Sequence, residues 1–255
     1  MELVDTHCHL QFDKLAENLD QVMISAEKSG VRRMICVGTS VDDSHKAVGY
    51  AGEYDNVWAS VGAHPHDGKH FDYKNDPARL AQMAALPRVV AFGEIGLDFY
   101  KDFSPRDEQE RLFRTQLEIG LAASLPVIFH VRDAWKDFWR ILDDYDGVKG
   151  VVHSFSSGRK QADRILEKGL YIGLNGIMTF TRDQAQLEAA KTIPLDKLLL
   201  ETDAPFLTPA PKRDELCEPR HVRVTAEFLS NLRGESIEEL SKTTTDNALR
   251  LFDLK

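Results

Sequence analysis

The chain alternates between short apolar runs and longer segments in which apolar and polar residues are mixed. Most of the short runs are continuously apolar, a pattern typical of parallel strands that are buried on both faces. Each run is therefore predicted to be a β-strand. The eight predicted strands cover residues 3–5, 33–38, 57–62, 89–93, 127–130, 150–153, 170–174 and 197–201.

The segments between the predicted strands have the pattern of amphipathic helices. In residues 109–123 the apolar positions recur at spacings of three and four, with charged residues opposite. Residues 157–169 end on a glycine, as helices often do. Eight strands that alternate with helices predict a single α/β domain with a (β/α)8 TIM-barrel fold, residues 1–255. A doubly wound open sheet is the alternative, but it requires a glycine-rich turn after the first strand, where this chain reads DTHCHLQF.

Composition and charge narrow the functional classes. The chain has 42% hydrophobic and 29% charged residues, the balance of an ordinary globular protein rather than a disordered one. Its net charge of −9 argues against a broad cationic face of the kind that binds nucleic acid through counterion release. An anionic substrate would therefore have to be held locally, by metal ions or by a few placed side chains.

The cysteines and the N-terminal residues give information about the cellular compartment of the protein. Cys8, Cys36 and Cys217 form no Cys-x-x-Cys pair, which argues against a disulfide scaffold and a zinc ribbon. The start of the chain lacks the basic and apolar regions of a signal peptide, and no apolar stretch approaches the roughly 18 residues of a membrane span. We therefore expect a cytoplasmic protein without membrane association, and no obligate protein partner is evident.

Side chains that can bind a metal gather at the ends of the predicted strands. Barrel enzymes carry their chemistry at the carboxyl ends of their strands. A chance distribution of histidines over the chain would seldom place five of nine there. The residues at these ends are, in chain order, His7, His9, His64, Glu94, His130, His153 and Asp203.

Several of these residues form a set that suits metal binding. His7 and His9 lie two residues apart in extended chain, so both imidazoles can face one ion while Cys8 points away to pack as a small apolar side chain. Alone, this pair is weak evidence, and His130 or His153 alone could be a buried core histidine. Together, four imidazoles and the carboxylates of Glu94 and Asp203 suit two divalent ions with one bridging carboxylate. A metal-free network of ion pairs is less consistent with these residues than a metal site is, because the set contains no lysine or arginine.

Six segments resemble the TatD family of metal-dependent deoxyribonucleases, within the amidohydrolase-like metal-dependent hydrolase superfamily. They occur in order across nearly the whole chain, which makes a chance similarity very improbable. They are DTHCHL at 5–10, VGAHPH at 61–66, GEIGLDF at 93–99, PVIFHVRDA at 126–134, VVHSFS at 151–156 and LLLETDAPFLTP at 198–209.

The resemblance implies a TIM barrel with a two-metal site that hydrolyses DNA phosphodiester bonds. It implies a 3′-to-5′ exonuclease acting on single-stranded ends, with Mg²⁺ as the favoured ion and Mn²⁺ or Zn²⁺ as alternatives. Asp203 would orient the attacking water and accept its proton, and the DNA would be held locally by the ions. One ion would be held by His7, His9, Glu94 and Asp203, and the other by the bridging Glu94, His130 and His153.

Further residues have predicted roles around this site. His64 resembles the family's substrate-facing histidine and is expected to contact phosphate, with a role in the turn at Pro65 as the alternative. Arg132 could either pair with a phosphate oxygen or brace the loop after the fifth strand. Glu201 and Asp98 are expected to orient ligands. The remaining histidines, His45, His66, His70 and His221, are expected on the surface or in loops. Packing rather than base stacking is favoured for most aromatic residues near the loops, which are Phe99, Tyr100, Phe103, Trp135 and Phe206.

The chain departs from the family pattern at two places, and two other functions stay open. Ser157 stands where the family has glycine, and residues 212–220 displace an arginine that normally adjoins Glu218-Pro219. Both changes bear on substrate recognition rather than on the metal site. The first alternative function is hydrolysis of an ester, amide or lactone, for example an aminoacyl-tRNA ester. Glu94 stands where such barrels usually carry a carboxylated lysine, which favours the nuclease. The second alternative is a binding protein with a vestigial site, but all six expected ligands are present.

Overall fold

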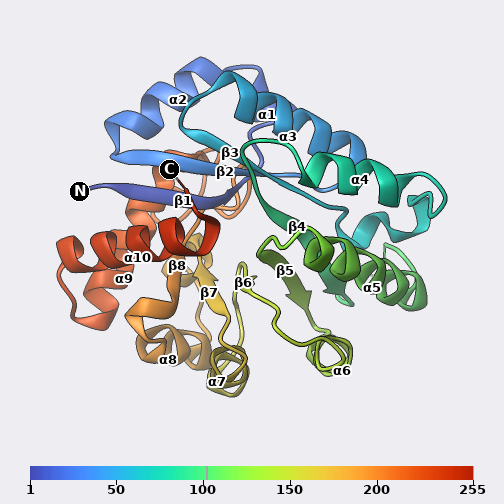
Figure 1. Cartoon of the computed structure of the whole chain (residues 1–255). Coiled ribbons are helices and arrows are strands. Elements are labelled where there is room, and N and C mark those ends of the chain that lie inside the picture. The colour runs from blue at the N-terminus through green and yellow to red at the C-terminus, as the bar shows by residue number, and fades with distance from the viewer. Residues whose placement is uncertain (102, 255) are drawn as a thin grey trace. The chain divides into compact units, whose positions relative to one another are not determined.

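The computed structural model describes residues 1–101 and 103–254, and the chain divides into two compact units (Figure 1). The terminal unit comprises Met1–Cys36 and Ser154–Lys255, and the central unit is Val37–His153. The predicted domain range 1–255 includes Asp102 and Lys255, which lie outside the described residues. That both units form one domain stays a prediction.

The terminal unit is built on parallel strands from the two ends of the chain. β1 pairs with β2, β7 pairs with β8, and a parallel bridge joins Cys8 at the end of β1 to Ala204 after β8. The strands are β1 (Leu3–Cys8), β2 (Val31–Val37), β7 (Tyr171–Leu174) and β8 (Leu198–Leu200). The helices are α1 (Asp13–Ala16), α2 (Leu19–Lys28), α7 (Arg159–Glu167), α8 (Gln184–Thr192), α9 (Val222–Arg233) and α10 (Ile237–Phe252), with short 3₁₀ helices η2 (Gly176–Thr179), η3 (Leu195–Lys197) and η4 (Pro219–His221).

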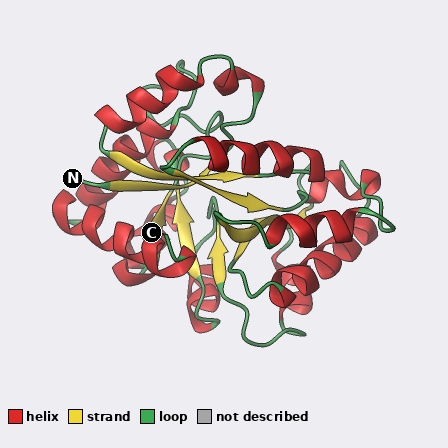
Figure 2. Cartoon of the chain, turned by 45° about the horizontal axis from the view of Figure 1, so that its top comes forward, coloured by secondary structure: helices red, strands yellow, loops and turns green. Residues whose placement is uncertain are grey.

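The central unit has the same alternation of strands and helices. β4 pairs in parallel with β3 on one side and with β5 on the other, and β5 pairs with β6. Helices follow the strands and lie along them, as Figures 1 and 2 show. The strands are β3 (Val57–Val61), β4 (Val89–Asp98), β5 (Val127–Arg132) and β6 (Gly150–Val152); the helices are α3 (Val41–Glu53), η1 (Pro65–His70), α4 (Asp76–Ala84), α5 (Arg106–Ala122) and α6 (Trp135–Leu142).

Aromatic packing holds β5 against its neighbouring helices α5 and α6. The rings of Phe113 on α5, Phe129 on β5 and Phe138 on α6 are fully buried, and their centroids lie 5.4–6.1 Å apart. Such aromatic contacts contribute about 0.5–1.5 kcal/mol per pair beyond the burial of area. Because Phe129 directly precedes His130, this packing holds a predicted ligand against a rigid support.

Three strands extend beyond the ends that the sequence pattern predicts: β5 by two residues, to Arg132, and β1 and β4 by more. β1 continues from the expected end at residue 5 to Cys8, and β4 continues from residue 93 to Asp98. His7 and Glu94 therefore lie within strands rather than directly after them. The extensions of β1 and β4 consist of buried residues, and their polar side chains have partners. An apolar run ends at the first polar residue. A strand continues for as long as its backbone and its buried polar side chains have hydrogen-bond partners.

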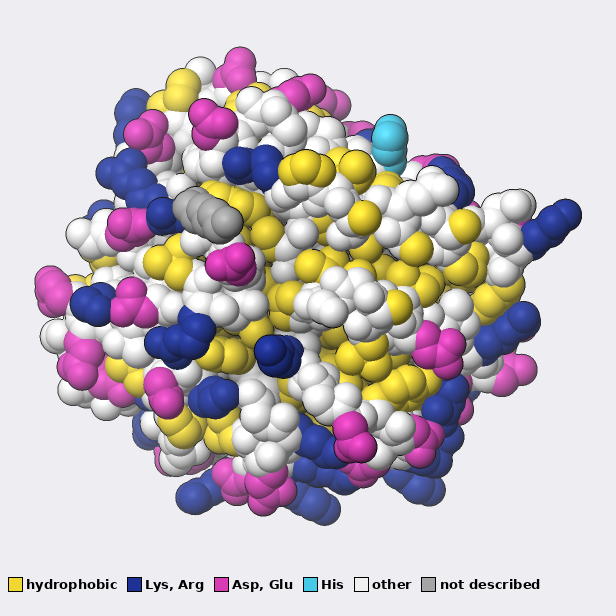
Figure 3. Space-filling view, viewed as in Figure 1, with side chains coloured by type: hydrophobic (Ala, Val, Ile, Leu, Met, Phe, Trp, Pro, Cys, Tyr) yellow, Lys and Arg dark blue, Asp and Glu magenta, His cyan; other side chains and the backbone are white. Residues whose placement is uncertain are grey.

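The surface of the described residues agrees with the composition. On the face that Figure 3 shows, basic and acidic side chains are interspersed. None of the helices in the part of the chain that the structure describes is long and apolar enough to cross a membrane.

Candidate metal centre

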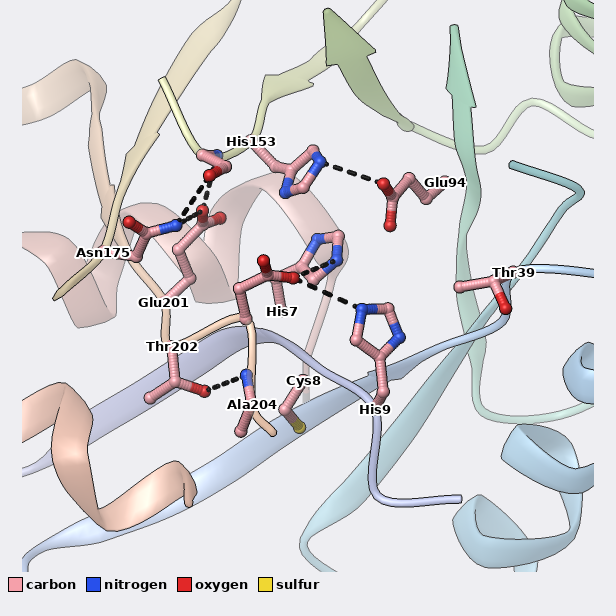
Figure 4. A network of polar contacts seen from close by, with 12 residues as sticks. His7, Cys8, His9, Thr39, Glu94, His153, Asn175, Glu201, Thr202 and Ala204 are labelled. Atoms are coloured by element: carbon pink, nitrogen blue, oxygen red, sulfur yellow. Dashed lines mark hydrogen bonds and ion pairs between the residues drawn. The ribbon is translucent and has the colours of Figure 1, made fainter. Parts of the chain in front are cut away.

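The central unit brings four predicted site residues together around one carboxylate oxygen. Oε1 of Glu94 lies 2.8 Å from Nδ1 of His130, 3.1 Å from Nε2 of His153 and 3.3 Å from Nε2 of His64. Nδ1 of His130 and Nε2 of His153 are 3.0 Å apart. Figure 4 shows the ring of His153 turned toward the carboxylate of Glu94. We call these four residues the central cluster.

The spacing of these atoms fits the coordination shell of a divalent ion. An ion bound at about 2.1 Å has neighbouring ligand atoms about 3.0 Å apart in octahedral and about 3.4 Å apart in tetrahedral coordination. The separations of 2.8–3.3 Å within the central cluster lie close to these values. His64, Glu94 and His130 alone already form a group whose ligand atoms converge. The donor set, one carboxylate with imidazoles, is the chemistry of many hydrolytic metal sites.

Glycines beside Glu94 allow this approach of the strands. Gly96 lies opposite His130 in the pairing of β4 with β5, and its φ is +147°. A Cβ atom at Gly96 would lie only 2.0 Å from the carbonyl oxygen of His130. Only glycine can therefore occupy this position without displacing β5. The Gly-Glu-Ile-Gly sequence thus brings the carboxylate of one strand to the imidazole of the next.

Asp98 fixes the ring of His130 from the other side. Its Oδ2 lies 3.2 Å from Nε2 of His130 and 2.9 Å from Nε2 of His66. Nε2 of His130 is thereby engaged, so Nδ1 is the nitrogen that faces Glu94. Gln109 holds Asp98 in turn, because its amide bonds to both the N–H and the carbonyl of that residue. This is the contact that the predicted orienting role of Asp98 requires.

The charges of the central cluster favour an ionised carboxylate. Burial opposes ionisation of Glu94, but the charges of His153 and His64 and hydrogen bonds from His130 and His153 lower its pKa well below the usual range. Burial would lower the pKa of His130, but its bonds with Asp98 and Glu94 raise it to about 9. Burial and the neighbouring His130 lower the pKa of His64 to about 4. Glu94 is therefore ionised, and the ring of His64 is neutral.

The terminal unit forms a second group, which we call the terminal cluster: His7, His9 and Asp203. Oδ1 of Asp203 lies 3.3 Å from Nε2 of His9 and 3.6 Å from Nε2 of His7, and Figure 4 shows both rings turned toward one carboxylate. The N–H of Asp203 donates to the carbonyl of His7 over 2.8 Å. Asp203 has a φ of +61°, which is uncommon for a residue other than glycine, and its side chain lies over the end of β1. The arrangement offers two imidazoles and one carboxylate to a cation.

Asp5 is a supporting residue that the sequence did not reveal. It is fully buried and accepts hydrogen bonds from Thr202 N over 2.9 Å, Thr202 Oγ1 over 2.6 Å and His7 N over 3.3 Å. The Oγ1 of Thr202 also accepts from the N–H of Ala204. Burial raises the pKa of Asp5 to about 8 although these hydrogen bonds lower it. Asp5 therefore fixes the backbone on both sides of Asp203. A signal existed, since Asp5 and His7 are two residues apart in a strand and share a face.

Glu201 makes contacts of the kind that an orienting role requires. It is fully buried, and its Oε1 accepts from Ser154 N over 2.6 Å and from Asn175 Nδ2 over 3.3 Å. Nδ2 of Asn175 also donates to Oγ of Ser154 over 2.9 Å, and Figure 4 shows this network. Ser154 directly follows His153, so these bonds fix the backbone next to that predicted ligand.

One histidine differs from expectation, and another has contacts at the site that were not expected. His66, expected on the surface or in a loop, pairs with Asp98, and its N–H donates to Nδ1 of His64. The sequence His64-Pro65-His66 indicated this contact, because the turn that positions His64 also brings His66 toward the same site. His221 is buried rather than exposed, and its Nδ1 accepts from the N–H of Glu218.

The structure also places three other predicted features: Arg132, Cys8 and the segment 212–220, which departs from the family pattern. Arg132 is exposed at the end of β5, with its guanidinium carbon 3.9 Å from the ring centre of Tyr100. Cys8 is fully buried, as expected of a packed apolar residue. In the segment 212–220, Arg213 lies over the ring of Phe180 at 3.8 Å, and Arg220 pairs with Glu215 and Glu218.

The sequence pattern of the family described as TatD related DNase matches residues 4–253. The chain belongs to the TatD family. It is 36% identical to the uncharacterized metal-dependent hydrolase YabD of Bacillus subtilis, over 98% of each protein. It is also 36% identical to a Salmonella typhimurium protein named 3'-5' ssDNA/RNA exonuclease TatD, over 99% of each.

Solved structures of TatD proteins share the fold. The crystal structure of YJJV, a TatD homolog from Escherichia coli, matches with a TM-score of 0.94 and 29% identity, over 99% of this chain and 98% of that one. The predicted (β/α)8 TIM barrel is thereby confirmed. The protein is a TatD-family metal-dependent hydrolase with candidate metal-binding groups in its described residues.

Proposed function

We propose that the protein is a divalent-metal-dependent 3′-to-5′ exonuclease that hydrolyses phosphodiester bonds at single-stranded DNA ends. One observation carries the proposal: a single oxygen of Glu94 lies within 2.8–3.3 Å of three imidazole nitrogens. Membership in the TatD family supports it, as does a relative at 36% identity that is named an exonuclease on single-stranded DNA and RNA. A cytoplasmic location stays a prediction.

We further propose that the two clusters together hold two divalent ions. His7, His9, Asp203 and Glu94 would ligate one ion, and the bridging Glu94, His130 and His153 the other. The supporting evidence is the donor chemistry of each cluster and the barrel fold, in which ligands lie at the carboxyl ends of strands. Mg²⁺ is the proposed native ion, and the four imidazoles also suit Mn²⁺ and Zn²⁺.

The protein's own residues have definite tasks in this reaction. Bound divalent ions would lower the pKa of a water and neutralise the phosphate oxygens. Asp203, held between His7 and His9, accepts the proton of the attacking water. Nδ1 of His64 accepts from the N–H of His66, so the ring proton is on Nε2, which faces Glu94 here and would donate to a phosphate oxygen when Glu94 holds an ion. Arg132 presents a fork of donors to another phosphate oxygen.

An end-labelled single strand tests this function. The purified protein is incubated with the strand labelled at either end, with Mg²⁺, Mn²⁺, Zn²⁺ or EDTA. We expect metal-dependent cleavage that shortens a 5′-labelled strand stepwise and releases the label of a 3′-labelled strand as a mononucleotide. Asp203→Asn should abolish cleavage, and the matched control Asp196→Asn, an exposed aspartate before β8, should not.

Two outcomes would change the proposal. Stepwise shortening of the 3′-labelled strand would reverse the polarity. Metal binding without cleavage of any strand would exclude the nuclease and favour an ester, amide or lactone substrate, such as an aminoacyl-tRNA ester, at the same residues.

A further inference from the structure

Three aromatic side chains are exposed in loops that follow strands carrying predicted ligands. The exposed fractions are 56% for Tyr100, 54% for Phe103 and 51% for Phe206. Trp135 stacks on Trp139, in agreement with the expectation that most of these aromatic residues pack, whereas these three contact neighbouring side chains and still keep about half of their surface exposed. A large apolar side chain left exposed beside a polar site is typical of a binding surface. Tyr100 and Phe103 belong to the central unit and can be related to its cluster.

Phe103 is joined to the central cluster by a short chain of contacts. Its ring lies edge-to-face with the ring of His66, with centroids 4.8 Å apart and planes at 73°. His66 pairs with Asp98, and the same Asp98 oxygen lies 3.2 Å from the ring of His130. The exposed phenyl ring is therefore only two side chains away from a proposed metal ligand.

Arg132 lies on the same side of β5 as His130. The two residues are two positions apart in the strand, so their side chains share a face, about 6.6 Å apart along the strand. The guanidinium lies over Tyr100, whose N–H donates to Asp98 Oδ1 over 3.0 Å. Among residues 1–101 and 103–254, no carboxylate forms an ion pair with Arg132, so its donors are available to an anion. The cation–π contact with Tyr100 restrains the position of the guanidinium.

We propose that Phe103, Arg132 and Tyr100 form a subsite for the nucleotide next to the scissile phosphate. The base stacks on Phe103, and Arg132, positioned by Tyr100, binds that nucleotide's phosphate. An exposed aromatic ring and a guanidinium that pairs with no described carboxylate, each linked to Asp98 through one intervening residue, match a ligand that offers a π-face and a negative charge together. Every base has such a face, so the subsite requires a base without selecting among the four. The inference rests on the proposed nuclease function and deepens it.

Binding of a single strand measures the contribution of the base directly. The probe is a fluorescein-labelled single-stranded DNA whose two 3′-terminal linkages are phosphorothioates, which slow its cleavage. A second strand carries abasic sites at its two 3′-terminal positions. Fluorescence anisotropy in Mg²⁺ gives Kd for the wild type, Phe103→Ala, Phe103→Trp and the control Leu86→Ala, which removes an exposed apolar side chain before β4.

The subsite predicts a specific pattern of affinities. Phe103→Ala should raise Kd for the base-bearing strand by about 5- to 150-fold, the range for one stacked base. It should leave Kd for the abasic strand unchanged. Phe103→Trp should bind both strands as the wild type does, and so should Leu86→Ala. Equal weakening of both strands by Phe103→Ala, or a change below twofold, would overturn the stacking role.

Arg132 has a different signature. Arg132→Gln should weaken both strands by the same factor and reduce the slope of log Kd against log salt by about one, because one phosphate contact is lost. An unchanged salt slope would remove Arg132 from the subsite. If the wild type neither binds nor cleaves any strand, the proposed function itself fails, and the subsite with it. If the wild type cleaves and Phe103→Ala behaves as the wild type does, only the subsite fails.

Discussion

The two clusters of candidate ligands are held in different ways. In the central cluster, a side chain holds the ligand side chain: the carboxylate of Asp98 contacts the ring of His130, and the amide of Gln109 holds the backbone of Asp98. In the terminal cluster, the main chain has this role. The N–H of Asp203 bonds to the carbonyl of His7, and Asp5 binds the backbone N–H of Thr202.

This difference indicates how damage should spread from each support. A change at Asp98 releases the imidazoles of His130 and His66 and leaves the strands paired. A change at Asp5 releases the turn after β8, so it affects the backbone of Asp203 and the stability of the terminal unit together. The supports of the central cluster should therefore matter mainly for metal affinity, and those of the terminal cluster for both stability and activity.

The largest expected effect comes from Glu94, around which the central cluster converges. Glu94→Gln keeps the size of the side chain and removes its charge, so kcat on single-stranded DNA should fall about 10³- to 10⁶-fold. The control is Glu118→Gln, at an exposed position of α5. Activity within tenfold of the wild type would mean that the converging atoms of this cluster are not the reaction site.

Asp98→Asn should have the next largest effect. The amide nitrogen cannot accept hydrogen bonds, so either His130 and His66 both lose their acceptor, or the N–H groups of Tyr100 and Lys101 do. Calorimetric titration with Mn²⁺ should give a Kd about 10- to 100-fold weaker, as for other residues that orient metal ligands. Asp107→Asn, an exposed change on α5, should bind as the wild type does. If Asp98→Asn lowered the free energy of unfolding in EDTA as much as Asp5→Asn does, the contrast between the clusters would be contradicted.

Asp5→Asn should change stability and activity together. Its fully buried carboxyl group has a pKa of about 8, so at pH 9 the carboxylate accepts three hydrogen bonds and the amide would set a donor against Thr202. We expect the free energy of unfolding in EDTA, measured by urea denaturation, to fall by about 1–3 kcal/mol. Activity of the folded protein should fall as well, and Thr202→Val should reproduce both effects in weaker form. A loss of stability with unchanged kcat would make Asp5 a purely structural residue.

The smallest expected effect is that of His66→Gln. Asp98 keeps its contact with His130, so the orientation of that ligand is retained in part. Mn²⁺ affinity should weaken less than tenfold, clearly less than for Asp98→Asn. If His66→Gln weakens binding as much as Asp98→Asn does, then His66 itself ligates the metal.

The sequence was sufficient for the order of strands and helices and for all the residues of both clusters. Both follow from patterns that a chain displays directly: apolar runs for buried parallel strands, and polar residues placed where those runs end. The expected burial of Cys8 was also correct. The lengths of β1 and β4 were not predictable in this way, because buried polar residues such as His7 and Glu94 continue the strands.

The supporting residues were harder to predict because their roles depend on contacts distant in sequence. Asp5 meets Thr202 across 197 positions, and His66 meets Asp98 across 32. A single sequence gives no pairing at such distances. Exposure of Phe103 was likewise hidden, because an aromatic residue in a loop packs or projects according to the neighbours that the fold supplies.

Manganese titration followed by electron paramagnetic resonance tests the central claim most directly. Apo protein is titrated with Mn²⁺, and bound ions are counted while their spectra are recorded. A two-ion centre bridged by Glu94 predicts two Mn²⁺ per chain with a spin-coupled spectrum, and Glu94→Gln should abolish the coupling. Binding of a single ion, or of two ions whose spectra show no coupling, would contradict the account.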